Sequence, residues 1–555
     1  MDKDGAKRRT STQVDHLEYV RLRAPKRDGQ TLDLPAGSEV AALLSDNLAR
    51  RQSDDQSSNS ASNDFPLKDL QTRARAEAIE LAVNWSNQYL PVEARVDANS
   101  LQASAPIIFG GHQPTLFHPG VWYKNFRLHQ IAQASGGTAI NMVVDNDLSG
   151  AASIKFPQKS KSRASIGLVA FDAPGLDVPF EMQNIVDQKV FESFGKKSAD
   201  SIAPLVSDPI VKHLWPEVVK AEKMLAQSHR ASTTGHAIAA GRHLLEHAHG
   251  LRTLEVPISR LAGSSSFAEF SAYLIENLSE LSDAYNQAVI GYRAKHGIRS
   301  SAHPVPELSR TEESGTEWLE APFWIWTDQS PLRKPMFVRQ IGNDLEISNS
   351  EVALAKISLP TWSHWLVAQN QQIQATGKGI FIRPRALITT MFARLLASDL
   401  FVHGIGGAKY DQLTDQIILS FFGVDPPRFI TATGSWRLPT GFPEVYPADI
   451  TSRKEALRKM RFHPEMFIST ADENTTRLIE SKHSAIAGRS EQSPLERHRA
   501  IESANLELQG LLEPERTAIE NEIDSLSEKI RDSQILNSRE FSFALHPVGL
   551  IDRLT

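Results

Sequence analysis

The residues best suited to bind or transform a ligand lie in the segment GGHQPTLFHPGVWYKNF, which starts at residue 110. Two glycines after an apolar run let the backbone turn sharply, so that Gly111 can present its N–H group to an anion. His112, Gln113 and His118 follow on the same turn, and Lys124 adds a positive charge in the helix expected next. A histidine there can donate to a phosphate or carboxylate, or transfer a proton near neutral pH. The alternative is that the histidines satisfy buried loop carbonyls, and their spacing favours neither interpretation.

Acidic residues end the next apolar run, in TAINMVVDND. Carboxylates at the carboxyl end of a strand are suited to bind hydroxyl groups, amines or a metal. We predict that Asp145 and Asp147 bind an amine or a hydroxyl group, with Asn146 between them as a substrate-binding residue. The alternative is an Asx turn, in which these side chains bond nearby backbone N–H groups.

A second cationic group lies much further along the chain. Arg383 and Arg385 follow an apolar run in FIRPRALITT, and a guanidinium in a cleft can hold a carboxylate or phosphate through two parallel hydrogen bonds. The next run, DLFVHGIGGAKYDQ, ends in a glycine-rich turn that lacks the residue order of a P-loop or a dinucleotide fingerprint. The turn repeats the chemistry of the first one on a strand that we expect to be its neighbour. It contributes four candidate ligand-binding residues, which are Gly406, Gly407, Lys409 and Tyr410.

An α/β unit has to position these groups. The order strand, glycine turn, helix, glycine turn, strand over residues 105–147 is typical of a βαβ unit, whose strands should be parallel. An open sheet of such units binds ligands beyond the carboxyl ends of its strands. We therefore predict an α/β protein with an open parallel sheet interrupted by helical insertions.

Composition changes along the chain predict six parts. Residues 1–65 are expected to be a flexible arm, because the stretch RRQSDDQSSNSASND within them is almost free of apolar residues. The other parts are residues 66–150, with a helix and the first half of the sheet; 151–330, a mixed but mainly helical insertion; 331–450, the second half of the sheet; 451–540, a helical coiled-coil region; and 541–555, a tail that returns to the core.

The coiled-coil prediction depends on one seam. Ile519, Ile523, Leu526 and Ile530 alternate steps of four and three residues. Because SPLERHRAIESANLELQGLL is a second helical stretch and Glu513-Pro514 supplies a turn, we predict an antiparallel hairpin. Partner docking or formation of a homodimer through this hairpin, and a simple capping role, stay open.

Composition excludes several classes of function. The 555 residues include no cysteine, which rules out thiolate catalysis, disulfides and cysteine-bound metals. A net charge of −6 argues against general nucleic-acid binding. The chain shows neither a signal peptide nor an apolar run approaching the roughly 20 residues of a membrane span. We predict a cytoplasmic protein with no nucleic-acid or membrane partner and no metal site.

These motifs, in this order, resemble the cysteine ligase family of bacillithiol biosynthesis. The family has a Gly-Gln-Gln turn followed by a helix with a Lys, a strand ending in Glu-Asp-His-Asp, an Arg-Pro strand, and a Gly-Pro-x-Glu-x-x-Tyr loop. The counterparts here are the segment from Gly111 to Lys124, residues 144–147, Arg383-Pro384 and residues 406–410. REFSFALHP, at residues 539–547, is similar to the end of the family's chains.

The resemblance implies a Rossmann-like core and a coiled coil used for dimerisation. It also implies a reaction that joins the carboxyl group of cysteine to the amine of glucosaminyl malate. Four positions differ from the family's motifs. His112 replaces a Gln, Val144 a Glu, Asn146 a His and Lys409 a Glu, and a base in place of that last acid argues for a more anionic ligand or a different substrate.

The sequence thus supports an enzyme that binds an anionic ligand, containing a sugar or a nucleotide, across the strand ends. In this hypothesis His112 is a donor or general acid–base, and Arg383, Arg385 and Lys409 hold the anion. The alternatives are a binding protein without catalysis, and an enzyme that transfers nucleotidyl or glycosyl groups on a similar core.

Overall fold

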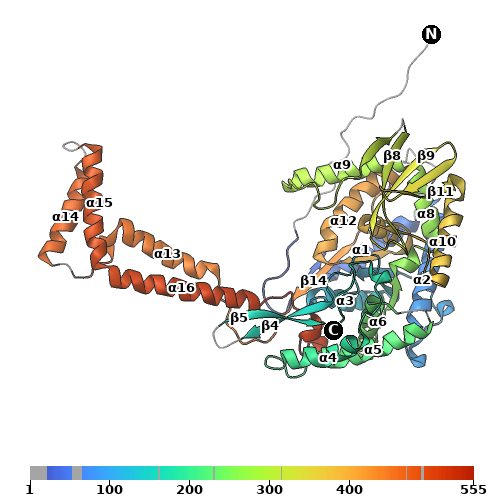
Figure 1. Ribbon diagram of the computed structural model, residues 1–555, viewed down its shortest axis with the longest axis horizontal. Coiled ribbons are helices and arrows are strands. Elements are labelled where there is room, and N and C mark those ends of the chain that lie inside the picture. The colour runs from blue at the N-terminus through green and yellow to red at the C-terminus, as the bar shows by residue number, and fades with distance from the viewer. Residues whose placement is uncertain are drawn as a thin grey trace, which may run out of the picture. The chain divides into compact units, whose positions relative to one another are not determined.

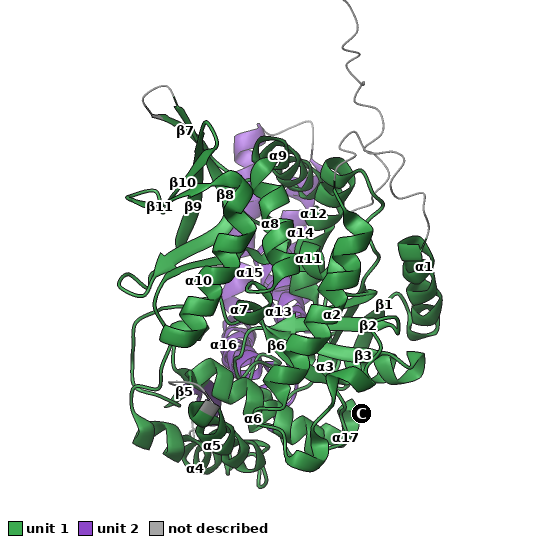
Figure 2. Ribbon diagram, turned by 90° about the vertical axis from the view of Figure 1, so that its right-hand side faces the viewer, with its two compact units in different colours: residues 1–154, 168–437, 539–555 green, residues 155–167, 438–538 purple. Residues whose placement is uncertain are grey.

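The computed structural model describes residues 22–52, 65–159, 163–228, 232–313, 316–470, 472–488 and 493–555. The chain divides into two compact units, which Figure 2 colours separately. Unit 1 comprises residues 1–154, 168–437 and 539–555, and unit 2 comprises residues 155–167 and 438–538.

Unit 1 contains a six-stranded sheet in the order β1-β14-β13-β2-β3-β6, of which Figure 2 labels β1, β2, β3 and β6. Its strands are β1 (Gln30–Leu34), β2 (Ile107–His112), β3 (Thr138–Val143), β6 (Leu254–Pro257), β13 (Leu400–His403) and β14 (Ile430–Ser435). All neighbours from β14 to β6 are parallel, whereas β1 pairs antiparallel with β14. The prediction of an α/β protein with a parallel sheet is confirmed, and β2 and β3 are adjacent parallel strands as expected.

Helices cover both faces of this sheet. The helix α3 (Pro119–Ser135) connects β2 to β3 and packs on β2, β3, β13 and β14. On the opposite face, alternate β2 residues such as Ile107 and Phe109 join a core with α2 (Leu67–Ser86) and α12 (Ile405–Ile417). The chain runs outward from β2 to β6 and later in the other direction, from β13 to β14. The strand order therefore reverses between β2 and β13, which is where open α/β sheets bind ligands.

A second sheet corrects the predicted division of the middle of the chain. Its order is β11-β10-β9-β8-β12, with β7 paired to β8, and all of its pairs are antiparallel. The strands are β7 (Arg310–Glu313), β8 (Thr316–Thr327), β9 (Lys334–Ile341), β10 (Asp344–Ser348), β11 (Ala353–Ser358) and β12 (Ile380–Pro384). Only β7 and β8 lie in the part predicted to be a mainly helical insertion. β9 to β12 lie in the part predicted to be the second half of the parallel sheet, which they do not join. Periodicity identifies an apolar run as a strand but does not say which strand it pairs with.

The other elements of unit 1 surround the two sheets. The predicted insertion also contains the two-stranded sheet of β4 (Ser153–Lys159) and β5 (Ala164–Ala170), part of which belongs to unit 2. The remaining helices are α4 (Gln188–Ile202), α5 (Val211–Ser228), α6 (Thr234–Ala248), α7 (Ile258–Leu261), α8 (Ser265–Glu276), α9 (Leu278–His296), α10 (Trp362–Thr376), α11 (Ala386–Phe392) and α17 (Leu550–Leu554).

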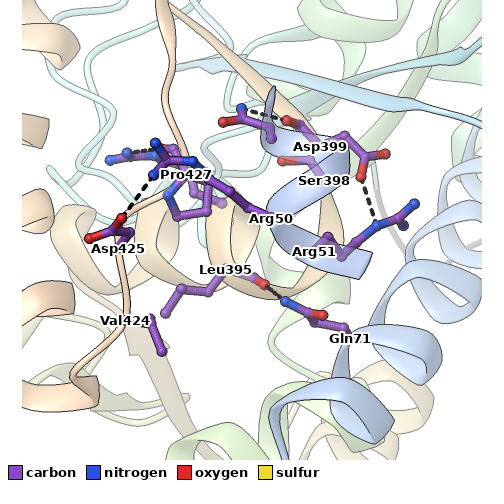
Figure 3. A pocket seen from close by; sticks show the side chains of 11 residues that line it. Arg50, Arg51, Gln71, Leu395, Ser398, Asp399, Val424, Asp425 and Pro427 are labelled. Atoms are coloured by element: carbon purple, nitrogen blue, oxygen red, sulfur yellow. Dashed lines mark hydrogen bonds and ion pairs between the residues drawn. The ribbon is translucent and has the colours of Figure 1, made fainter. Parts of the chain in front are cut away.

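The predicted flexible arm is wrong for residues 22–52, which pack on the main sheet. They form β1 and the helix α1 (Val40–Gln52), and Asn47 of α1 donates to the carbonyl of Asp399 at 2.8 Å. Figure 3 shows the neighbouring contact, in which Arg51 Nε lies 3.3 Å from Asp399 Oδ1. The polar composition that suggested an arm is concentrated in residues 53–64, which lie outside the described residues, as do residues 1–21.

Unit 2 is largely helical. It contains α13 (Pro447–Phe462), α14 (Glu473–Ala487), α15 (Pro494–Leu511) and α16 (Glu513–Leu536). Figure 1 shows α14 lying along α15, and α13 along α16. The predicted hairpin of α15 with α16 is not formed, because α13 is the helix that packs along α16. An apolar seam requires a helical partner but does not specify which helix supplies it.

We predict that Asp399→Asn strongly destabilises unit 1. Asp399 is 3% exposed, and its Oδ2 accepts from Arg75 Nη1 at 2.9 Å and from the backbone N–H of Ile107 at 2.8 Å. Removing the charge leaves a buried guanidinium unpaired, which costs about 3 kcal/mol of unfolding free energy. Urea denaturation measures the change.

Asp425→Asn is the matched control. Asp425 is 73% exposed and pairs with Arg50 at 3.4 Å, so its loss should cost less than about 1 kcal/mol. Equal losses in the two variants would contradict the role given to Asp399.

Candidate functional site

The candidate site lies at the carboxyl edge of the main sheet. The segments after β2, β3 and β13 leave the same edge because these strands are parallel neighbours. β2 pairs with β13 from Ile108–Leu400 to Gly110–Val402. The two glycine turns, which are far apart in the sequence, therefore lie next to each other.

Lys124 occupies the point where the strand order reverses. Its Nζ donates to the carbonyl of Gly111 at 2.8 Å, and a Cβ added to Gly404 would lie 3.9 Å from the same Nζ. Burial, followed by the positive charge of Arg242, lowers the pKa of Lys124 to about 7. Within the described residues no carboxylate forms an ion pair with this ammonium group.

The first turn of α12 borders this ammonium group. Gly404 is the N-cap, and no side chain of the described residues caps this end of the helix. Gly406 and Gly407 are exposed, whereas Lys409 and Tyr410 are half-buried. The N–H groups of a first helical turn have no acceptor within the helix, so they are available to an anion.

The predicted catalytic role of His112 is not supported. Its Nδ1 lies 3.2 Å from the carbonyl oxygen of Gln113, and its Nε2 lies 3.1 Å from Asn125 Oδ1 and 3.2 Å from Arg242 Nη1. Burial, followed by the positive charges of Arg242 and Lys124, lowers the pKa of His112 well below its usual value. A buried, neutral imidazole with both nitrogens engaged fits the alternative of a histidine that satisfies the loop.

A network of buried charges around Arg242 contacts His112. Arg242 forms ion pairs with Glu255 and with Glu246, the latter at 3.1 Å from Nε to Oε1. Glu246 also accepts from Trp122 Nε1 at 2.6 Å and from Asn125 Nδ2 at 2.7 Å. The network ties α6, β6 and α3 together beneath the end of β2.

Asp145 is also placed differently from the prediction. It is completely buried, its Oδ1 accepts from the backbone N–H of Ser259 at 2.9 Å, and its Oδ2 accepts from Ser259 Oγ at 2.5 Å. Oδ2 also lies 3.0 Å from Nε2 of His236. Burial raises the pKa of Asp145, but the hydrogen bonds and charge of His236 and the hydrogen bonds of Ser259 outweigh it, so that the pKa is lowered. Both oxygens are therefore engaged by the protein, and Asp145 positions His236 rather than binding a ligand directly.

The next two predicted residues hold loops together. Asn146 donates to the carbonyl of Pro384 at 2.8 Å, which joins the end of β3 to the end of β12. Asp147 accepts from Gln113 Nε2 at 3.0 Å, and Arg333 Nη1 lies 3.0 Å from its other oxygen. Gln113 and Asp147 thus meet as the prediction of a shared site requires.

The two predicted arginines reach the same edge but are paired. Arg383 donates to both oxygens of Glu181 at 2.8 Å and is 1% exposed, which corrects its predicted role as an anion clamp. Arg385 donates to Glu320 at 2.6 Å and stacks 4.3 Å from the ring of Trp324. Its Nε has no hydrogen-bond partner among the described residues.

Two further predicted residues lie at the edges of the site. His118 is the N-cap of α3, where its Nδ1 accepts from the N–H of Gly120 at 3.1 Å, so it acts structurally. The Tyr410 ring lies 6.0 Å from the ring of His303.

Sequence reasoning missed His236, Ser259, Glu181 and Arg333. His236 follows an ordinary N-cap, Thr233, whose side chain accepts from the His236 N–H at 3.2 Å. Its partner Asp145 lies 91 positions earlier in the chain, so no local motif marks the pair.

No family model matches the chain, and no curated protein has a matching sequence. Within the described ranges, no three His, Asp or Glu side chains are grouped closely enough to hold a metal ion. No helix of the described segments combines the length and apolar character needed to cross a membrane.

We predict that His112→Ala lowers the unfolding free energy by about 1–3 kcal/mol, because it leaves buried polar groups of the loop without partners. Exposed His213 is the control, since changes at such surface positions stay within about 0.5 kcal/mol. Chemical denaturation of both variants measures the difference. If His112→Ala is as stable as His213→Ala, the structural role is wrong.

Proposed function

We propose that the protein is an enzyme with a Rossmann-like core that binds an anionic ligand at the carboxyl ends of β2 and β13. Numbered along the chain, its parallel strands are β2, β3, β6, β13 and β14. Their spatial order is third, second, first, fourth, fifth, which matches the order of dinucleotide-binding sheets. A sugar- or nucleotide-containing ligand fits this edge.

Lys124 is the observation that carries the proposal. A buried charge without a counter-charge destabilises a folded protein, and such groups gather at functional sites. An anion bound at the first turn of α12 would neutralise the ammonium group of Lys124. It would also accept hydrogen bonds from the free N–H groups of that turn. Lys409 would add positive charge, whereas the charge of Arg385 is already neutralised by Glu320.

The resemblance to bacillithiol cysteine ligases supports an amide-forming reaction. In it, a cysteine carboxyl group would be joined to the amine of an amino-sugar malate in the cytoplasm. The motifs that follow β2, β3 and β13 come to one edge of one sheet, and Arg383-Pro384 of β12 reaches it from the second sheet. That convergence favours a shared site over unrelated loops.

Two other functions stay in competition. A binding protein without catalysis would hold the same anion but form no product, and a nucleotidyl- or glycosyl-transferring enzyme would form a product without a new amide. Incubation with a nucleotide, cysteine and glucosaminyl malate, followed by mass spectrometry, separates the three.

Lys124→Met should abolish anion binding and stabilise the free protein. The pKa of Lys124 is about 7 in the fold against a usual 10.5, so between these pH values the unfolded chain binds a proton that the folded chain lacks. Stability should therefore rise with pH across this window in the wild type. In the variant this rise disappears, and the variant gains on the order of 5 kcal/mol at pH 7 and below.

Thermal unfolding across that pH range, with and without ADP or inorganic pyrophosphate, measures both effects. Lys196→Met is the control, because Lys196 is 83% exposed. Equal anion-induced shifts in Lys124→Met and wild type would exclude the proposed site.

We also infer that unit 2 docks a second copy of the chain. A hollow of about 1190 Å³ lies between α13 and α15 and is flanked by the ends of α14 and α16. Phe462, Ile486 and Leu506 line it and are 51%, 51% and 63% exposed. Apolar side chains this exposed around a hollow are typical of a protein interface.

Leu506→Asp should convert a dimer to a monomer of 61.5 kDa, because a charge would be buried in the interface. Light scattering after size-exclusion chromatography measures the mass. A wild-type protein that is already monomeric would contradict the interface.

A further inference from the structure

His236 and Asp145 form a buried pair at the same edge as the proposed ligand site. Asp145 follows β3, His236 lies in the first turn of α6, and Ser259 follows β6. Asp145 is completely buried, whereas 14% of the His236 side chain is exposed. The carboxylate is thus sealed inside the protein while the imidazole reaches solvent.

The hydrogen bonds settle which nitrogen of His236 carries a proton. The lowered pKa of Asp145 keeps it ionised, and an ionised carboxylate can only accept. Nε2, at 3.0 Å from Asp145 Oδ2, must therefore be the N–H nitrogen. Nδ1 then keeps its lone pair, and no polar group of the described residues hydrogen-bonds to it.

Charges around the pair are balanced. Glu181 is held by Arg383 through two hydrogen bonds of 2.8 Å, and its backbone N–H donates to the carbonyl of Asp145 at 2.8 Å. Arg260 of α7 also interacts electrostatically with the carboxylates of Asp145 and Glu181. Two carboxylates therefore face two guanidinium groups around the pair.

We infer that His236 is the proton acceptor of this site and that Asp145 is its positioning residue, an inference that rests on the proposed ligand site at this edge. An amine or hydroxyl group of the acceptor substrate attacks the carbonyl carbon of a carboxyl group that the nucleotide has activated as a phosphoryl ester. The new C–N or C–O bond forms, the bond from that carbon to the phosphate leaving group breaks, and the proton of the attacking group passes to Nδ1. The Nε2–H bond to Asp145 persists, and the imidazolium later releases the added proton to solvent. This is the chemistry expected of an imidazole oriented by a carboxylate.

Carbethoxylation by diethyl pyrocarbonate tests whether the Nδ1 lone pair is available, without requiring a known substrate. His236 should be labelled at a rate of the same order as His213, an exposed histidine that pairs with Asp208 at 3.1 Å. His243 should stay unlabelled, because it is buried and its nitrogens bond Tyr89 and the carbonyl of Thr253. If His236 is as unreactive as His243, the inference is overturned, whatever the fate of the proposed function.

Turnover tests the role itself. In the coupling assay described above, His236→Gln should lower kcat by about 10²- to 10⁴-fold, and Asp145→Asn by at least about tenfold. The control variant His213→Gln should turn over at the wild-type rate. Full activity of His236→Gln refutes the inference even if the protein proves to be a ligase. A wild type that makes no amide refutes only the proposed ligase reaction, and the labelling result then decides about His236.

Discussion

A buried charge needs an opposite charge nearby, and this requirement organises the carboxyl edge of the main sheet. Arg242 meets Glu246 and Glu255, Arg383 meets Glu181, and Arg385 meets Glu320. Apart from Arg242–Glu246, which lies within α6, these pairs join separate elements, so neutralising the charges also fixes the loops. Removing one member of such a pair costs more than the pair contributes, because the other charge stays buried alone.

Lys124 is the exception to this pattern. Lys124 is 6% exposed, and its ammonium group donates to a neutral carbonyl, with another cation, Arg242, as its main charged neighbour. This unpaired buried charge, which destabilises the fold, lies next to the N–H groups of the first turn of α12, which have no acceptor within the helix. Perturbed buried groups of this kind gather at functional sites, which is why we propose that Lys124 binds an anionic ligand.

Local patterns in the sequence predicted the βαβ unit, since the glycine turns, the helix and both strands follow one another directly. They also predicted that Gly111, Lys124 and the turn at Gly406 share an edge, because parallel strands end on the same side. They did not predict the partner of β12, because IFIRP has the same composition whichever sheet it joins. The prediction of an α15–α16 hairpin was wrong for the same reason, because α16 packs along α13 instead.

The candidate site shows where such reasoning fails on individual side chains. Histidine and aspartate in a ligand-facing loop suggest catalysis, yet burial engages both nitrogens of His112 and both oxygens of Asp145. The ligand-facing role predicted for Asp145 is one that we propose for His236 instead. The two residues are 91 positions apart in the chain and are joined by a hydrogen bond. A sequence shows which chemical groups are present, but their exposure depends on the packing of elements that are distant in the chain.

The spacing of strands relates the two proposed groups to one ligand. The anion site lies between β13 and β2, and the His236–Asp145 pair lies beyond the ends of β3 and β6. With neighbouring strands about 4.8 Å apart, the two positions are separated along the edge by two strand spacings, or about 10 Å. That distance fits a ligand whose charged group is held at α12 while an amine or hydroxyl group about 10 Å away faces Nδ1 of His236. A much smaller anion would fill the first position without reaching the second, so it should bind without being transformed.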